Sequence, residues 1–262
     1  MKLKIYQIDA FADKVFSGNP AAVCILDSWL DEGLMQQIAS ENNLAETAFV
    51  VKNKNRYDIR WFTPELEVDL CGHATLASAF VLFKHYIPNS KSIDFYSTRS
   101  GPLVVEKGKD GLYIMDFPTD DIKQITAISA LNEALGIHPK ETLKGKTDYL
   151  LIVDSQKEVE EINPNFFLLD KIDARGIIVS AKGEDVDFVS RFFAPQSGIN
   201  EDPVTGSAHT TLTPYWSKVL GKDVLFAKQL SQRGGKLICE NHGERVRISG
   251  KAVSYLEGEI EV

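Results

Sequence analysis

The sequence contains no long hydrophobic run. None of its apolar stretches approaches the roughly 18 residues that a membrane-spanning helix needs, so we expect no membrane association. Residues 1–5 alternate between polar and apolar side chains, as a strand does, and do not form the apolar core of a signal peptide. These absences predict a cytoplasmic protein.

Cysteine is scarce and scattered. The three cysteines, Cys24, Cys71 and Cys239, are odd in number and far apart, which excludes a disulfide framework and a CxxC metal site. The HExxH pattern of many zinc enzymes is also missing. We therefore expect a reducing environment, no bound metal and no cluster of metal-ligating cysteine and histidine.

Positive charge and nucleotide-binding motifs are missing as well. The formal net charge is −8, which argues against nucleic acid and against an anionic membrane surface as partners. No GxGxxG follows an expected strand, no GxxxxGK[ST] is present, and no GxSxG surrounds Ser207. We expect a protein without cofactors, whose chemistry comes from side chains and helix ends alone.

What the sequence does contain is a repeated unit. Arg60-Trp61-Phe62-Thr63-Pro64 is matched by Arg191-Phe192-Phe193-Ala194-Pro195, and a glycine-led helix start follows each. The helix starts are Gly72-His73-Ala74-Thr75 and Gly206-Ser207-Ala208-His209, the second lying three residues further from its proline. The bare N–H groups of a helix start favour an anion such as a carboxylate or an oxyanion.

The repeat predicts a duplicated domain, because one unit spans about half of the 262 residues. Strands outnumber helices without regular alternation, which favours an α+β fold over a doubly wound sheet. We expect an N-terminal half at residues 1–118, to which a final strand at about 252–262 returns, and a C-terminal half at 119–251. The two halves are expected to form a pseudo-twofold pair with a cleft between them. Small residues over 74–79 predict a buried central helix.

Glu46 lies in an apolar strand expected over residues 44–51. With a period of two, Glu46 has apolar neighbours on either face of the sheet. A carboxylate there loses hydration, which favours its protonated form and suits a general acid/base that works near neutral pH. The alternative is that Glu46 lies at a sheet edge or a strand end and points to water.

Five blocks of sequence, taken in their order along the chain, resemble the PhzF-like phenazine-biosynthesis isomerase/epimerase family. The blocks cover most of the chain, so their combination is more specific than any one of them. They are Asn19-Pro20-Ala21-Ala22-Val23, Asn43-Leu44-Ala45-Glu46-Thr47-Ala48-Phe49, Arg60-Trp61-Phe62-Thr63-Pro64, Cys71-Gly72-His73-Ala74-Thr75 and Glu201-Asp202-Pro203-Val204-Thr205-Gly206-Ser207-Ala208.

The resemblance implies a diaminopimelate-epimerase-like fold. In that fold, two similar domains each wrap a β-barrel-like sheet around a central helix, and the active site lies in the interdomain cleft. It also implies a cofactor-independent proton shift between carbons of a small carboxylic acid, and a homodimer. It does not name the substrate, because pocket-lining loops are where specificity varies.

The resemblance also assigns site residues. It implies that Glu46 is the catalytic acid/base, and that His73, Asp202 and Ser207 line the same cleft. The remaining motif residues are expected to contact the substrate; they are Asn19, Cys71, Gly72, Thr205 and Gly206. Plainer alternatives stay open, since His73 or Ser207 could cap its helix and Asp202 could merely complement the helix dipole.

Cys71 raises a further alternative. Related amino-acid epimerases use two thiols, one from each half, and here Cys71 stands at one thiol position while Pro203 stands at the other. Proline cannot transfer a proton, so a two-thiol racemase is disfavoured. A single-thiol racemase that depends on Cys71, a Cys71 that is only a small buried residue, and a catalytically silent protein that binds a small acid all remain open.

Overall fold

The computed structural model describes residues 1–262 and divides into two compact units. Unit 1 comprises Met1–Asp116 and Ser249–Val262, and unit 2 comprises Phe117–Ile248. These boundaries lie within three residues of those expected. The last strand, β18 (Ala252–Glu261), pairs antiparallel with the first, β1 (Lys2–Ala10), which places the C-terminus in unit 1. No helix combines the length and the apolar character that crossing a membrane requires.

Unit 1 is a continuous run of paired strands. Its order is β18–β1–β2–β3–β4–β6–β7–β8, with the short strand β5 added to β4. Helix α1 connects β2 to β3, and helix α2 with its following π-helical turn lies between β5 and β6. The bounds are β2 (Asn19–Leu26), α1 (Glu32–Asn42), β3 (Glu46–Asn53), β4 (Arg56–Phe62), β5 (Glu67–Val68), α2 (Gly72–Val81), the π turn (Leu82–Tyr86), β6 (Ser92–Ser97), β7 (Gly101–Lys107), a 3-10 turn (Lys109–Gly111) and β8 (Tyr113–Pro118).

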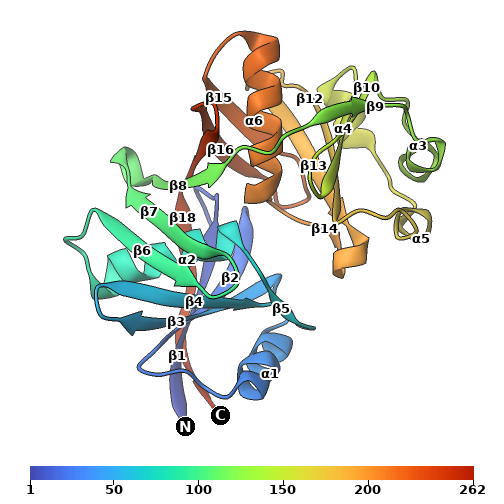
Figure 1. The fold of residues 1–262 in the computed structure, drawn as a ribbon. Coiled ribbons are helices and arrows are strands. Elements are labelled where there is room, and N and C mark those ends of the chain that lie inside the picture. The colour runs from blue at the N-terminus through green and yellow to red at the C-terminus, as the bar shows by residue number, and fades with distance from the viewer. The chain divides into compact units, whose positions relative to one another are not determined.

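The strands of unit 1 surround α2 (Figure 1). The helix contacts β1, β2, β3, β7 and β18, and nearly all of its residues are buried. Alanines 74, 77 and 79 leave little side-chain bulk on the helix, so the strands approach its backbone closely. The expected buried central helix is confirmed.

Unit 2 repeats this plan. Its order is β9–β10–β11–β12–β13–β15–β16, with the short strand β14 added to β13. The bounds are β9 (Lys123–Ile125), α3 (Ser129–Leu135), β10 (Glu141–Lys144), β11 (Asp148–Ile152), α4 (Gln156–Glu161), α5 (Phe166–Leu169), β12 (Gly176–Lys182), β13 (Phe188–Ala194), a 3-10 turn (Pro195–Ser197), β14 (Ile199–Glu201), α6 (Gly206–Leu220), β15 (Val224–Gln229), β16 (Gly235–Asn241) and β17 (Arg245–Gly250).

The strand pairings confirm the duplication. In unit 1, β2 and β3 are parallel, β3 and β4 antiparallel, β4 and β6 parallel, and β6 and β7 antiparallel. In unit 2, the same sequence of pairings runs through β11, β12, β13, β15 and β16. The helix α6 enters between β14 and β15, as α2 enters between β5 and β6. Two halves with this shared pattern are what the repeated sequence unit predicted.

Helix α6 carries a proline in its interior, Pro214. Proline has no N–H, so the carbonyl of Thr210, four residues earlier, loses its helical donor. The N–H of Asp120 lies 3.3 Å from that carbonyl, and the Asp120 carboxylate accepts a 2.9 Å hydrogen bond from Thr211 Oγ1. Asp120, in the segment that begins unit 2, therefore supplies the hydrogen-bond donor that Pro214 lacks and also accepts a bond from the same helix turn.

Candidate functional site

Glu46 is the first residue of β3 and lies opposite Ala21 of the parallel strand β2. Its position at a strand end fits one of the two alternatives, but its orientation does not, because only 9% of the residue is exposed. Its Oε2 atom lies 3.1 Å from Nε2 of His73, at ion-pair distance, and no hydrogen bond from any other group reaches that oxygen. Glu46 is therefore a desolvated carboxylate with one close cationic neighbour.

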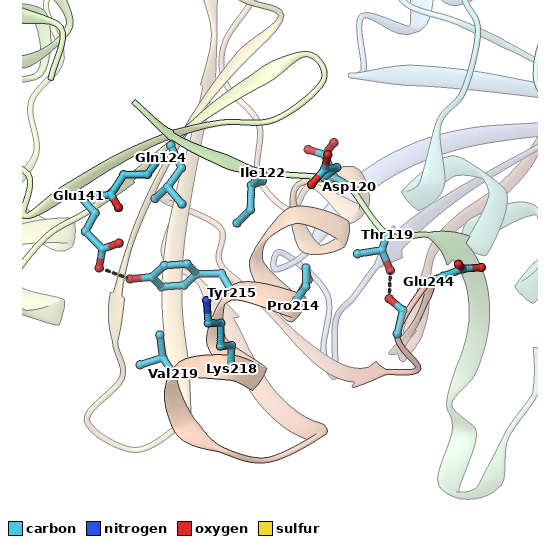
Figure 2. A pocket seen from close by; sticks show the side chains of 13 residues that line it. Thr119, Asp120, Ile122, Gln124, Glu141, Pro214, Tyr215, Lys218, Val219 and Glu244 are labelled. Carbon is cyan, nitrogen blue, oxygen red and sulfur yellow. Dashed lines mark hydrogen bonds between the residues drawn. The ribbon is translucent and has the colours of Figure 1, made fainter. Parts of the chain in front are cut away.

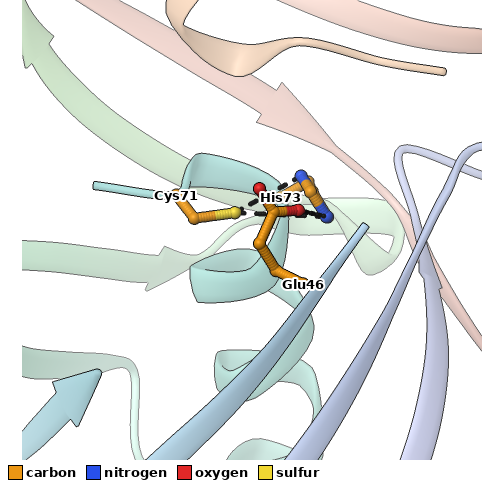
Figure 3. Close-up of side chains that lie close together, drawn as sticks. All are labelled: Glu46, Cys71 and His73. Atoms are coloured by element: carbon orange, nitrogen blue, oxygen red, sulfur yellow. Dashed lines mark hydrogen bonds and ion pairs between the residues drawn. The ribbon is translucent and has the colours of Figure 1, made fainter. Parts of the chain in front are cut away.

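The start of α2 supplies the other members of this cluster (Figure 3). Cys71 is the residue before the helix, Gly72 begins it, and His73 follows on its first turn. Cys71 Sγ lies 3.5 Å from His73 Nδ1, and Asn19 Nδ2 lies 3.1 Å from the same nitrogen. No side chain caps α2, so His73 does not cap its helix. The fold thus brings together every site residue that the sequence predicts in unit 1.

The Cys71 thiol and the His73 ring both have pKa values above their ordinary ones, but for different reasons. Burial raises the pKa of the Cys71 thiol to about 11, and the nearby Glu46 carboxylate adds to this effect. Burial alone lowers the pKa of His73, but Cys71 and Glu46 outweigh it and hold that pKa well above its ordinary value. The sulfur is thus held as a thiol, and the ring is held as an imidazolium beside the Glu46 carboxylate.

Glu46, Cys71 and His73 also form a set of candidate metal ligands. One ligand atom from each lies within 4.8 Å of the other two, and all three residues are buried. The sequence carries no motif that joins these three residues, and the expectation of no bound metal stays a prediction. Spacing motifs detect ligands that are neighbours in sequence, whereas Glu46 comes from a strand that only the fold places beside α2.

In unit 2, Asp202 and Thr205 are joined in one buried network. Thr205 Oγ1 donates a short hydrogen bond to Asp202 Oδ2, and Thr205 N–H donates to Gln229 Oε1 at 2.9 Å. Gln229 Nε2 in turn donates to the Asp202 carbonyl at 2.7 Å. The sequence analysis missed Gln229; its only signal was a polar residue at the end of a strand whose alternate side chains are buried.

Ser207 lies on the first turn of α6 and does not cap the helix, because the residue before the helix is Thr205 and no side-chain cap is made. Its Oγ atom accepts hydrogen bonds from Arg175 Nη2 at 3.1 Å and Nη1 at 3.2 Å. Arg175 also forms an ion pair with the buried Asp148. Since a hydroxyl that accepts from a guanidinium keeps its own proton, Ser207 can donate a hydrogen bond. Arg175 and Asp148 carried no motif and were missed.

His209 is the second buried histidine of the molecule. Its Nδ1 lies 2.8 Å from the Thr205 carbonyl, its Nε2 has no partner, and burial lowers its pKa to about 4. The ring is therefore neutral and acts as a hydrogen-bonded packing group. The sequence analysis assigned no chemical role to His209, in agreement with this placement.

One groove of about 800 Å³ lies elsewhere in unit 2 (Figure 2). Tyr215 Oη donates to Glu141 Oε1 at 2.9 Å on its wall, and Thr119 Oγ1 donates to the Gly243 carbonyl at 2.7 Å. None of the predicted site residues lines it. The groove is therefore separate from the candidate site.

Comparison with known proteins identifies the family. The family model described as "Phenazine biosynthesis-like protein" (PhzC-PhzF) matches residues 8–258. An uncharacterized isomerase of Pseudomonas aeruginosa is 51% identical, with all of both chains covered. The crystal structure of a PhzF family protein from Enterococcus faecalis has a TM-score of 0.96 at 48% identity and covers both chains completely. A hydroxyproline epimerase from Agrobacterium vitis shares the fold, with a TM-score of 0.66 at 10% identity over 99% of this chain and 91% of that one. The chain therefore belongs to the PhzF phenazine biosynthesis-like family and is an isomerase.

Proposed function

We propose that the protein is a cofactor-independent isomerase that moves a proton between carbons of a small carboxylic acid, with Glu46 as the acid/base. The observation that carries the proposal is the state of the Glu46 carboxylate. Glu46 is 9% exposed, and its Oε2 atom has His73 Nε2 as its one close polar neighbour. A desolvated carboxylate with an uncommitted lone pair is suited to accept a proton from carbon.

The proposed step balances without an oxidant or a reductant. The substrate C–H bond breaks, its proton passes to Glu46, and its electron pair delocalises into the substrate's unsaturated or carboxyl group. The proton on Glu46 exchanges with solvent, and Glu46 then delivers a proton to another carbon, or to the other face of the same carbon. The N–H groups of Gly72 and His73 at the start of α2 have no helical acceptor and can stabilise the developing negative charge.

The comparison of the halves supports a single acid/base. Strands β3 and β12 have the same pairing pattern, and the position of Glu46 at the start of β3 corresponds to Gly176 at the start of β12. The residue before the helix is Cys71 in unit 1 and Thr205 in unit 2. The helix starts therefore pair Cys71 with Thr205, whereas the sequence analysis had placed Pro203 at the second thiol position. Unit 2 therefore supplies neither a carboxylate nor a thiol at these positions. Asp202 and Ser207 stay in the proposal as hydrogen-bonding residues for the substrate.

The experiment is proton exchange in heavy water. A panel of unsaturated cyclic acids and amino acids is incubated with the wild type and with Glu46→Gln, and deuterium on carbon is followed by mass spectrometry and NMR. We expect exchange with the wild type, loss of exchange in Glu46→Gln, and unchanged exchange in the control Glu65→Gln, an exposed glutamate. Exchange that survives in Glu46→Gln would move the chemistry to another residue. An acid that binds but is recovered unchanged and undeuterated would show a binding protein instead.

A further inference from the structure

Arg175 lies beside Ser207 at the start of α6 and is itself held by the protein. It is the residue before β12, and its partner Asp148 is the first residue of β11 and is 1% exposed. The guanidinium binds both carboxylate oxygens of Asp148, through Nε at 2.9 Å and through Nη2. The ring of Phe192 has its centre 5.6 Å from Arg175 Cζ. A paired carboxylate at one edge and an aromatic ring beside it fix the plane of the guanidinium.

The fixed guanidinium determines which way the Ser207 hydroxyl points. Ser207 Oγ accepts hydrogen bonds from Nη2 at 3.1 Å and from Nη1 at 3.2 Å. A serine oxygen has two acceptor lone pairs, so Arg175 engages both of them. The hydroxyl keeps one further capacity, which is to donate its own proton in a direction away from the cation. Ser207 can therefore donate to a substrate atom but cannot accept from one.

A hydroxyl restricted in this way selects the kind of atom that it contacts. A substrate N–H or O–H group would find no acceptor at Ser207, whereas an oxygen that carries negative charge finds a donor already oriented. The guanidinium bound to Ser207 Oγ polarises the O–H bond and makes it a stronger donor to an anion. The arrangement therefore favours a substrate oxygen on which charge develops, such as the enolate oxygen that forms when a proton leaves the carbon next to a carboxyl group.

We propose that Arg175, held by Asp148, is a positioning residue that fixes Ser207 as a hydrogen-bond donor to the substrate oxygen that gains negative charge in the proton transfer. The inference rests on the proposed function, because that reaction supplies the developing charge. Arg175 takes part in no covalent step, and the Ser207 proton stays on Ser207. Arg175 acts through another residue, so its replacement should slow the chemical step more than it weakens binding of the acid.

The arrangement belongs to unit 2 alone. The strand register and the helix starts match Asp148, Arg175 and Ser207 with Ala21, Ala45 and His73 of unit 1. Neither alanine carries a charge or a hydrogen-bonding side chain. Each half thus prepares its helix start differently: unit 1 places a carboxylate beside His73, and unit 2 places a cation beside Ser207.

A double-mutant cycle tests whether Arg175 acts through Ser207. Arg175→Lys keeps a cation beside the buried Asp148 but replaces the planar fork by one ammonium group, which cannot hold Asp148 and both lone pairs of Ser207 together. We expect the kcat of deuterium exchange to fall about tenfold in Arg175→Lys, with KM changed less than about twofold, and about 100-fold in Ser207→Ala. The double variant should also fall about 100-fold and not about 1,000-fold, because no hydroxyl remains to be positioned.

The matched control is Arg56→Lys, because the Arg56 side chain is as exposed as that of Arg175 and also pairs with an aspartate. It should leave kcat and KM unchanged, and thermal melting of each variant shows whether it folds. A double variant about 1,000-fold slower than the wild type, a wild-type kcat in Arg175→Lys, or a change in KM alone would overturn the positioning role. In each of these cases, exchange that is lost in Glu46→Gln would still support the proposed function.

NMR of the guanidinium groups tests the contact without activity. In protein labelled with ¹⁵N-arginine, the hydrogen bond to Ser207 should slow rotation of the Arg175 Nη1 group and give separate proton signals, and Ser207→Ala should average them. Arg191, whose Nη1 donates to the Ile162 carbonyl at 2.7 Å, should keep its signals in both proteins. Identical Arg175 signals in the wild type and Ser207→Ala would overturn the contact. Absence of exchange in the wild type would overturn the proposed function and leave this NMR result to decide whether Arg175 positions Ser207.

Discussion

The two halves of the molecule share a framework but differ at the strand start where Glu46 lies. In unit 1, β3 begins with Glu46, whereas β12 of unit 2 begins with Gly176. A Cβ atom added to Gly176 would lie 2.1 Å from the ring of Phe192, so that position accepts no side chain unless the ring moves. The two halves thus share the strand pairing, but a carboxylate stands at this position in unit 1 and an aromatic ring takes up the space in unit 2.

The two buried histidines extend the comparison. His73 and His209 both lie near the start of their unit's central helix and are equally enclosed. Yet the pKa of His73 is raised, because Cys71 and Glu46 outweigh its burial, while the pKa of His209 falls to about 4, because burial acts there without an acidic neighbour. Burial alone does not decide the charge of a histidine; the neighbouring side chains decide it.

The largest expected effect concerns catalysis. Glu46→Gln should lower proton exchange by about 1,000-fold, since a positioned general base contributes roughly 10²–10⁴-fold. Ser207→Ala should lower it by about 100-fold, the usual effect of losing one hydrogen-bond donor to a developing charge. Rates of deuterium incorporation measure both. Equal losses in the two variants would contradict a single acid/base in unit 1.

The next largest effect compares two equivalent ion pairs. Arg60 binds Glu67 and Arg191 binds Glu201, each through Nε and Nη2. Glu67 has a second partner, Arg99, whose Nη2 lies 2.8 Å away. Arg191→Ala leaves a mostly buried carboxylate without a cation and should cost about 3 kcal/mol, whereas Arg60→Ala should cost about 1 kcal/mol.

Urea unfolding of the two arginine variants measures the difference in the free energy of unfolding. The double variants that also replace the glutamate by glutamine provide the control. In them the cost of the Arg191 change should shrink, because no uncompensated charge remains. If Arg60→Ala proves the more destabilising, the assignment of Arg99 as a second partner is wrong.

The pH dependence of stability should follow His209. Its pKa is about 4 in the folded protein and near 6.5 when unfolded, so the unfolded chain binds more protons between these values. Stability is therefore complete above about pH 6.5 and is lost as the pH falls, by about 2 kcal/mol at pH 5. His209→Leu should remove this component, and His242→Gln, at an exposed site, should keep it. Urea unfolding at several pH values distinguishes them.

The smallest expected effect concerns the proline in α6. Asp120→Ala removes the carboxylate that accepts from Thr211 Oγ1 and, at the exposed end of the side chain, from the N–H of Lys146, while the backbone bond to Thr210 remains possible. A loss of about 1 kcal/mol is expected, the usual net value of such a hydrogen bond. In Asp120→Ala with Pro214→Ala, the helix regains its own bond to Thr210 and part of the loss should be recovered. No recovery would show that Asp120 does not support the proline-containing helix.

Much of the fold was predictable because it repeats in the sequence. The aromatic–proline strand and the glycine-led helix start occur twice, and the structure places α2 and α6 at both. The short strands β9 and β10 were not predicted, since they have three and four residues and are rich in polar side chains. Such strands form because a neighbouring strand offers a partner, which is a tertiary effect.

The sequence by itself determined the duplication, the order of strands and central helices, and the identity of the acidic residue in an apolar strand. Those features follow from local periodicity and from motifs that a single chain displays. Only the tertiary structure decided that Glu46, Cys71 and His73 meet within 4.8 Å, and that Arg175 holds Ser207. The reason is physical: local pattern fixes the element on which a residue lies, whereas the pKa of a group depends on side chains that other elements bring to it.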